Sequence, residues 1–143
     1  MATGPAQRGV LDTSTVILLE RIAEVSSLPQ EPMITAVTLA ELSVGPLVAA
    51  SPQEQAIRQM RLQQAEADFQ PLAFDAAAAR SFGRVAASLR RGERESSARA
   101  YDAMIAAIAI VNDLPLFMCY PSDFDANDEL DLRPIPHPDR MQD

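Results

Sequence analysis

Apolar and polar positions along the chain follow two spacings, one typical of strands and one typical of helices. Short apolar runs bounded by Pro, Asp or Gly predict strands, and we expect these at residues 8–11, 33–37, 69–74, 116–120 and 132–135. Longer stretches with apolar residues every three or four positions predict helices, at residues 16–22, 38–48, 52–68, 76–91 and 98–112. Because strands alternate with helices, the sequence predicts an α/β fold with a parallel sheet.

The stretch 98–112 is the most apolar part of this pattern. Between Ala100 and Val111 every residue except Asp102 is apolar or aromatic, which predicts a helix buried on all sides. Ser96 or Ser97 is a candidate N-cap for this helix. Asp102 could merely complement the helix dipole. A buried carboxylate is costly unless it is paired or binds a metal, so a functional role is an equal alternative.

Acidic and hydroxyl residues also mark the ends of other elements. Asp12 follows the first strand, at the end where open α/β sheets bind ligands, and Thr13 or Ser14 is the expected N-cap of the next helix. Thr38 and Glu41 have the spacing of a capping box. Glu41 is therefore a capping residue or a functional acid, and the sequence leaves both interpretations open.

Length and composition predict a single domain. The chain has 143 residues, of which 48% are hydrophobic and 22% charged, and we expect the domain to cover residues 8–135 with terminal extensions at 1–7 and 136–143. No apolar run reaches the roughly 18 residues of a membrane span, and the first residues lack the apolar core of a signal peptide. Cys119 has no partner for an internal disulfide, which favours a reducing, cytoplasmic location.

The charge is acidic overall but unevenly distributed. A formal net charge of −8 argues against nonspecific binding to nucleic acid. All 12 basic residues are Arg, and half of them lie between Arg80 and Arg99. Such a cluster is usually a solvated helix face, although clustered Arg can also form a local phosphate-binding patch.

The sequence contains no Gly-rich phosphate loop, CxxC pair, HExxH or GxSxG motif, so acidic residues are the remaining candidates for chemistry. Asp12, Glu41, Asp102 and Asp123 can meet at the carboxyl edge of a parallel sheet. Two charges about 4 Å apart repel by roughly 4 kcal/mol at an effective dielectric of about 20, so such a cluster needs protons or a cation. Oxygen ligands favour Mg²⁺ or Mn²⁺, and this predicts metal-dependent phosphodiester hydrolysis.

Three segments in this order resemble one family. LDTS (11–14), TLAEL (38–42) and ARAYDAMIAAIAIVNDLPLF (98–117) are similar to PIN-domain proteins, specifically the VapC toxins of bacterial toxin–antitoxin pairs, and the resemblance covers roughly residues 8–135. It implies an α/β/α sandwich with a five-stranded parallel sheet, often dimeric. It also implies an Mg²⁺- or Mn²⁺-dependent endoribonuclease that cuts tRNA or ribosomal RNA and inhibits translation. The all-Arg, Ala-rich composition resembles actinobacterial, and specifically mycobacterial, proteins.

The resemblance assigns roles residue by residue. Asp12, Glu41 and Asp102 match the three principal acids of the family. The fourth acidic or Asn position falls near Tyr120, where this chain departs from the pattern, and Asp123 is the candidate replacement. That departure puts a second metal position in doubt.

The resemblance also implies partners. Arg99 and Ser14 are candidate RNA contacts, with helix surface and helix capping as their respective alternatives. A VapB antitoxin is expected to occupy an apolar groove and to place a basic side chain in the acidic site, and the candidate groove residues are Val16, Leu19, Leu47 and Val48.

Two other functions remain compatible with the same fold. One is a housekeeping RNA-processing nuclease, which the absence of an extra RNA-binding domain makes less favoured. The other is a catalytically inactive protein-binding domain that keeps the acids as a structural cluster. RNA cleavage by the pure protein distinguishes this last function from the first two.

Overall fold

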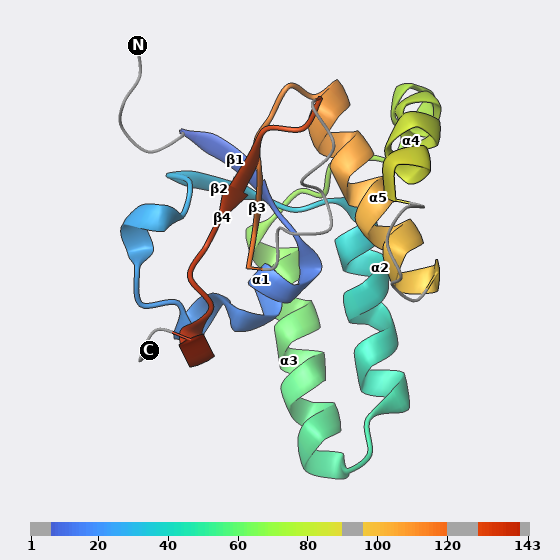
Figure 1. The fold of residues 1–143 in the computed structure, drawn as a ribbon. Helices are drawn as coiled ribbons and strands as arrows, with labels where there is room; N and C mark the ends of the chain where they lie inside the picture. Colours follow the sequence, from blue (N-terminus) through green and yellow to red (C-terminus); the bar gives the residue numbers. More distant parts are fainter. Residues whose placement is uncertain (1–6, 90–95, 120–128, 141–143) are drawn as a thin grey trace.

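The computed structural model (Figure 1) describes residues 7–89, 96–119 and 129–140. Its strands and α-helices, in chain order, are β1 (Arg8–Leu11), α1 (Thr13–Leu18), β2 (Glu31–Met33), α2 (Ala36–Val44), α3 (Pro52–Asp68), α4 (Ala76–Leu89), α5 (Ser96–Val111), β3 (Leu116–Met118) and β4 (Leu132–Pro134). Short 3-10 helices cover Leu19–Arg21, Val25–Ser27, Gly45–Val48 and Pro138–Arg140. None of the helices in these ranges is long and apolar enough to cross a membrane.

The strands form one parallel sheet in the order β2-β1-β3-β4, which confirms the predicted fold class. The expected fifth strand, residues 69–74, is reduced to a single parallel bridge between Thr35 and Leu72. Leu72 donates to the Ile34 carbonyl at 3.0 Å, and its own carbonyl accepts from Ala36 at 2.8 Å.

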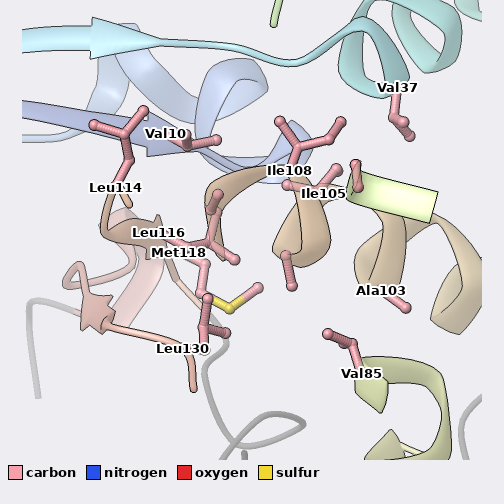
Figure 2. Close-up of a cluster of buried hydrophobic side chains, with 13 residues drawn as sticks. Val10, Val37, Val85, Ala103, Ile105, Ile108, Leu114, Leu116, Met118 and Leu130 are labelled. Carbon is pink, nitrogen blue, oxygen red and sulfur yellow. The ribbon is translucent and has the colours of Figure 1, made fainter. Parts of the chain in front are cut away.

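Two apolar cores cover the two faces of the sheet, as expected for an α/β/α sandwich. On one face, Val10, Leu116 and Met118 pack with the helices α4 and α5, as Figure 2 shows. On the other, Leu11 and Phe117 pack with residues of α1, α2 and α3. Successive strand residues point to opposite faces, so the two central strands, β1 and β3, contribute to both cores.

The helix α5 is the buried central helix that the sequence predicts. From Ile105 to Ala109 its residues are at most 1% exposed, and the helix packs against α4 (Figure 1). Ser96 and Ser97 are already helical, so neither is the predicted N-cap. Tyr101 is 45% exposed and Asp102 is half-buried, so the N-terminal part of α5 emerges from the core.

Candidate active site

Asp12 connects β1 to α1 and is the N-cap of that helix. Its Oδ1 accepts a hydrogen bond from the Thr15 backbone N–H at 3.0 Å, and its Oδ2 accepts one from the Ser14 hydroxyl at 3.0 Å. The prediction that Thr13 or Ser14 caps the helix is therefore wrong, because the strand ends at Leu11 and the helix already begins at Thr13. A carboxylate has about four lone-pair sites, so both oxygens of Asp12 can still bind a cation.

Glu41 lies in the second turn of α2 and points back to the start of α1. The N-cap of α2 is Thr35, whose hydroxyl accepts from the Thr38 N–H at 3.1 Å. Thr38 is inside the helix, so the predicted capping box with Glu41 is wrong. Instead, the Thr13 hydroxyl donates to Glu41 Oε1 at 2.6 Å, and the hydroxyls of Thr13 and Thr38 are 2.9 Å apart. The capping alternative for Glu41 is thereby excluded.

The two carboxyl groups are electrostatically coupled. Burial raises the pKa of Asp12, which is 5% exposed, against the opposing effect of its hydrogen bonds from Thr15 and Ser14. Burial also raises the pKa of Glu41, the Thr13 hydrogen bond opposes this rise, and the negative charge of Asp12 adds to it. Both acids resist ionisation, and a nearby cation would favour their charged forms.

The end of β3 belongs to the same edge of the sheet. Burial raises the pKa of the Cys119 thiol, and the charge of Asp12 raises it further. The Cys119 Sγ also lies 3.8 Å from the Thr15 hydroxyl. The carboxyl ends of β1 and β3 therefore meet beside Asp12, as the parallel topology predicts.

Asp102 lies in the N-terminal part of α5. The helices α2 and α5 are in contact, and a cavity of about 300 Å³ between them is lined by Ala40, Glu41, Val44 and Tyr101. Tyr101 immediately precedes Asp102, so the cavity places the N-terminal part of α5 opposite Glu41. Within the described residues, however, no group of three or more Asp, Glu, His or Cys side chains is spaced to hold a metal ion. The convergence of all the acids thus stays a prediction.

The other predicted site residues have different surroundings. Asp123 and Tyr120 lie outside the described residues. Arg99 is half-buried on α5, and its buried Nε has no hydrogen-bond partner among the described residues. Ser14 uses its hydroxyl hydrogen on Asp12. The roles of these residues in RNA or metal binding remain predictions.

Two hydroxyl residues were not assigned to the site from the sequence. The sequence predicts Thr13 as a helix cap and Thr38 as half of a capping box, yet their hydroxyls contact each other and that of Thr13 donates to Glu41. One feature of the sequence does indicate a role in the site. Thr13 and Thr38 both follow predicted strands, and the carboxyl ends of these strands meet at one edge of the sheet. Capping statistics favoured the local explanation.

An apolar groove lies beside α1, on the other face of the sheet from α5. It has a volume of about 210 Å³, and its apolar lining includes Val16, Ile17, Leu19, Ile57 and Met60, from α1, its 3-10 extension and α3. Ile57 and Met60 are 58% and 66% exposed. Two of the predicted groove residues line it; the other two, Leu47 and Val48, are exposed on the 3-10 helix after α2 and are not part of its lining.

Comparisons with known proteins give consistent results. The family model of the PIN domain matches residues 10–130. Ribonuclease VapC5 of Mycobacterium tuberculosis is 39% identical over 130 residues, which are 90% of this chain and 93% of that protein. The structure of VapBC-5 from the same organism, a member of the VapBC family of toxin–antitoxin systems, matches with a TM-score of 0.76 and 33% identity, over 90% of this chain and 99% of that one. VapBC2 from Rickettsia felis, solved with a promoter DNA fragment, matches with a TM-score of 0.69 over 90% and 98% of the two chains; its 17% identity supports a common fold alone.

Proposed function

The chain belongs to the PIN-domain family, in its VapC branch, and we propose on that premise that it is a ribonuclease toxin. In this proposal it is an Mg²⁺- or Mn²⁺-dependent endoribonuclease that inhibits translation and is neutralised by a VapB-type antitoxin. The observation that carries the proposal is the coupled pair Asp12 and Glu41 at the carboxyl edge of the sheet. Such a pair, in a chain without other catalytic motifs, suits metal-assisted phosphodiester hydrolysis.

A divalent metal ion fits the chemistry of the donor groups. Asp12, Glu41, Asp102 and Asp123 would hold it, and all four offer the oxygen ligands that Mg²⁺ and Mn²⁺ prefer. The raised pKa values of Asp12 and Glu41 support this assignment, because a bound cation offsets both desolvation and mutual repulsion. When bound, the ion supplies an activated water and neutralises charge on the phosphate.

The protein's own groups would orient the acids and the substrate. Thr15 and Ser14 hold the two oxygens of Asp12, so this carboxylate is fixed before substrate arrives. Arg99 would contact a phosphate of the RNA, since guanidinium groups bind phosphate well and its Nε has no hydrogen-bond partner among the described residues. Ser14 would be the second RNA contact, through a lone pair of its hydroxyl oxygen. The proposed substrate is tRNA or ribosomal RNA.

The antitoxin would bind the apolar groove between α1 and α3. Ile17, Ile57 and Met60 present apolar side chains to solvent there, and helix-in-groove recognition uses such anchors. The net charge of −8 would accelerate encounter with a basic peptide segment. We also propose that the protein forms a homodimer and that it assembles with the antitoxin into a larger complex.

Cleavage of RNA by the purified protein tests the function. We expect Mg²⁺- or Mn²⁺-dependent cutting of total cellular RNA, which is lost in Asp12→Asn and Asp102→Asn. Asp75→Asn is the matched control, because Asp75 caps α4 through a 3.0 Å bond from Ala78 N, as Asp12 caps α1. End-mapping of the products after brief induction identifies the RNA and the cut site.

The outcomes separate the possibilities. No cleavage by the parent protein with either metal would favour a protein-binding domain and contradict the proposal. Cleavage at the parent rate by Asp12→Asn would refute the role of the acidic pair. Loss of cleavage in Asp75→Asn as well would show that the assay reports stability instead of chemistry.

A further inference from the structure

Two threonine hydroxyls connect the start of α1 to the acid on α2. The Thr13 hydroxyl lies 2.6 Å from Glu41 Oε1 and 2.9 Å from the Thr38 hydroxyl. Thr13 is the first residue of α1, next to Asp12, whereas Thr38 and Glu41 lie one turn apart on α2. These contacts join segments 25 and 28 residues apart in the chain.

The number of hydrogens gives this contact a direction. Each hydroxyl has one hydrogen to donate, and Thr13 donates its hydrogen to the Glu41 carboxylate. The hydrogen between the two threonines therefore comes from Thr38, so the order is Thr38 to Thr13 to Glu41. Thr38 is 0% exposed, so water cannot replace its partner without opening the packing of α2.

A glutamate side chain has several rotatable bonds, and holding it in one place costs conformational entropy. The Thr13 hydroxyl fixes one oxygen of Glu41 and leaves the other oxygen available. The position of Thr13 is itself fixed in two ways. Its neighbour Asp12 caps α1, and the Thr38 hydroxyl donates a hydrogen bond to the Thr13 hydroxyl. A hydrogen bond that only joined α1 to α2 could use any acceptor on α2. Here the acceptor is Glu41, the half-buried acid whose pKa the charge of Asp12 raises.

We propose that Thr13, held in place by Thr38, is a positioning residue that orients the Glu41 carboxylate beside Asp12 and so sets the affinity of the acidic site for a divalent cation. This inference rests on the proposed function. Hydrogen-bond partners of metal ligands change metal affinity by about 10- to 100-fold when they are removed. Thr13 acts through Glu41 and does not itself bind the ion.

Binding of Mn²⁺ alone to the full-length protein tests the inference, with free Mn²⁺ measured by electron paramagnetic resonance. Thr13→Val removes the hydroxyl at constant shape and should raise the dissociation constant by about 10-fold or more. Thr13→Ser keeps the hydroxyl and should restore affinity close to that of the parent. In a Glu41→Gln background, Thr13→Val should have no further effect.

Thr35→Val is the matched control, because it makes the same change at another buried threonine, the N-cap of α2. The Thr35 hydroxyl accepts from the Thr38 backbone N–H at 3.1 Å, so this change removes a helix cap and keeps the Thr13 and Thr38 hydroxyls. This variant should lose stability without a comparable loss of Mn²⁺ affinity. Circular dichroism establishes that each variant is folded, and Thr13→Ala against Thr13→Ser provides the comparison if Thr13→Val does not fold.

The possible failures are distinguishable. If the parent binds Mn²⁺ and Thr13→Val binds it equally well, the positioning role is wrong while the proposed metal site stands. If Thr13→Val and Thr35→Val weaken binding equally, the effect is structural and the inference is also wrong. If the parent itself does not bind Mn²⁺, the proposed metal site and this inference both fail.

Discussion

Replacing Asp12 with asparagine should stabilise the metal-free protein at neutral pH. Burial raises the pKa of Asp12 above its ordinary value of 3.8, so the folded state holds this proton more tightly than the unfolded chain does. The ionised carboxylate therefore destabilises the fold, fully above the raised pKa and less as the pH falls towards 3.8. Asparagine removes the charge, so its stabilising effect should be largest at pH 7 and should disappear at low pH.

Alanine at the same position should behave differently, because Asp12 also caps α1. The bond from the Thr15 N–H to Oδ1 is the kind of N-cap whose loss costs about 1 kcal/mol, within a range of roughly 0.5–2. Asparagine keeps an acceptor for this bond, and the Ser14 hydroxyl can rotate to accept from its amide. We therefore expect Asp12→Asn to be more stable than Asp12→Ala by about 1 kcal/mol, or roughly 2–4 °C in Tm for a domain of this size.

Urea unfolding at pH 7 and near pH 4, without divalent cations, measures both differences. The controls are Asp75→Asn and Asp75→Ala, since Asp75 caps α4 but is exposed. At Asp75, alanine should be destabilising by a similar amount, and asparagine should give little gain at either pH. The reasoning is refuted if Asp12→Ala is as stable as Asp12→Asn, or if the gain from asparagine is the same at both pH values.

Three further predictions concern the fold, the groove and the metal site. Gly9→Ala should destabilise the protein by about 1–3 kcal/mol in urea unfolding, because its Cβ would lie 2.4 Å from Phe117 Cε1; an unchanged midpoint would contradict this packing. Met60→Glu should weaken binding of a VapB-type antitoxin by at least about 10-fold in calorimetry, because it places a charge among the apolar anchors of the groove, and equal affinity would exclude the groove. Asp123→Asn should raise the Mg²⁺ concentration needed for RNA cleavage while Asp125→Asn should not; equal behaviour would remove Asp123 from the proposed site.

The sequence predicted the parts of the fold that repeated patterns determine. The apolar run around Asp102 predicted the buried helix α5, and the continuous run at 116–120 predicted the buried strand β3. Each of these two predictions depends on many consecutive apolar residues, so no single residue decides it. The fifth strand depended on the short segment 69–74, which contributes a single bridge to Thr35.

Helix starts were harder to predict, because neighbouring hydroxyl and acidic residues compete for the same role. Thr35 and Thr38 are both good N-caps, and the spacing of Thr38 to Glu41 favoured the second. The structure uses Thr35, because β2 ends at Met33 and the next residues pair with Leu72 before the helix begins. Long-range pairing thus decided between two locally equivalent caps.

The same competition explains how much of the candidate site was visible in the sequence. The acids Asp12 and Glu41 could be named, because parallel strands bring their carboxyl ends to one edge. The Thr13 hydroxyl that bonds Glu41 could not be named, since the partners of Thr13 are far away in sequence.

Burial and local hydrogen bonds act in opposite directions on the acids of this edge. Burial raises the pKa of Asp12 and Glu41, whereas the bonds from Thr15 and Ser14 to Asp12, and from Thr13 to Glu41, lower it. Each of these donors belongs to the first turn of α1, so one short segment both begins a helix and stabilises two negative charges. If α1 began one residue later, the donors would rotate away from both carboxylates. The register at which β1 ends is therefore a requirement for the proposed chemistry as well as for the fold.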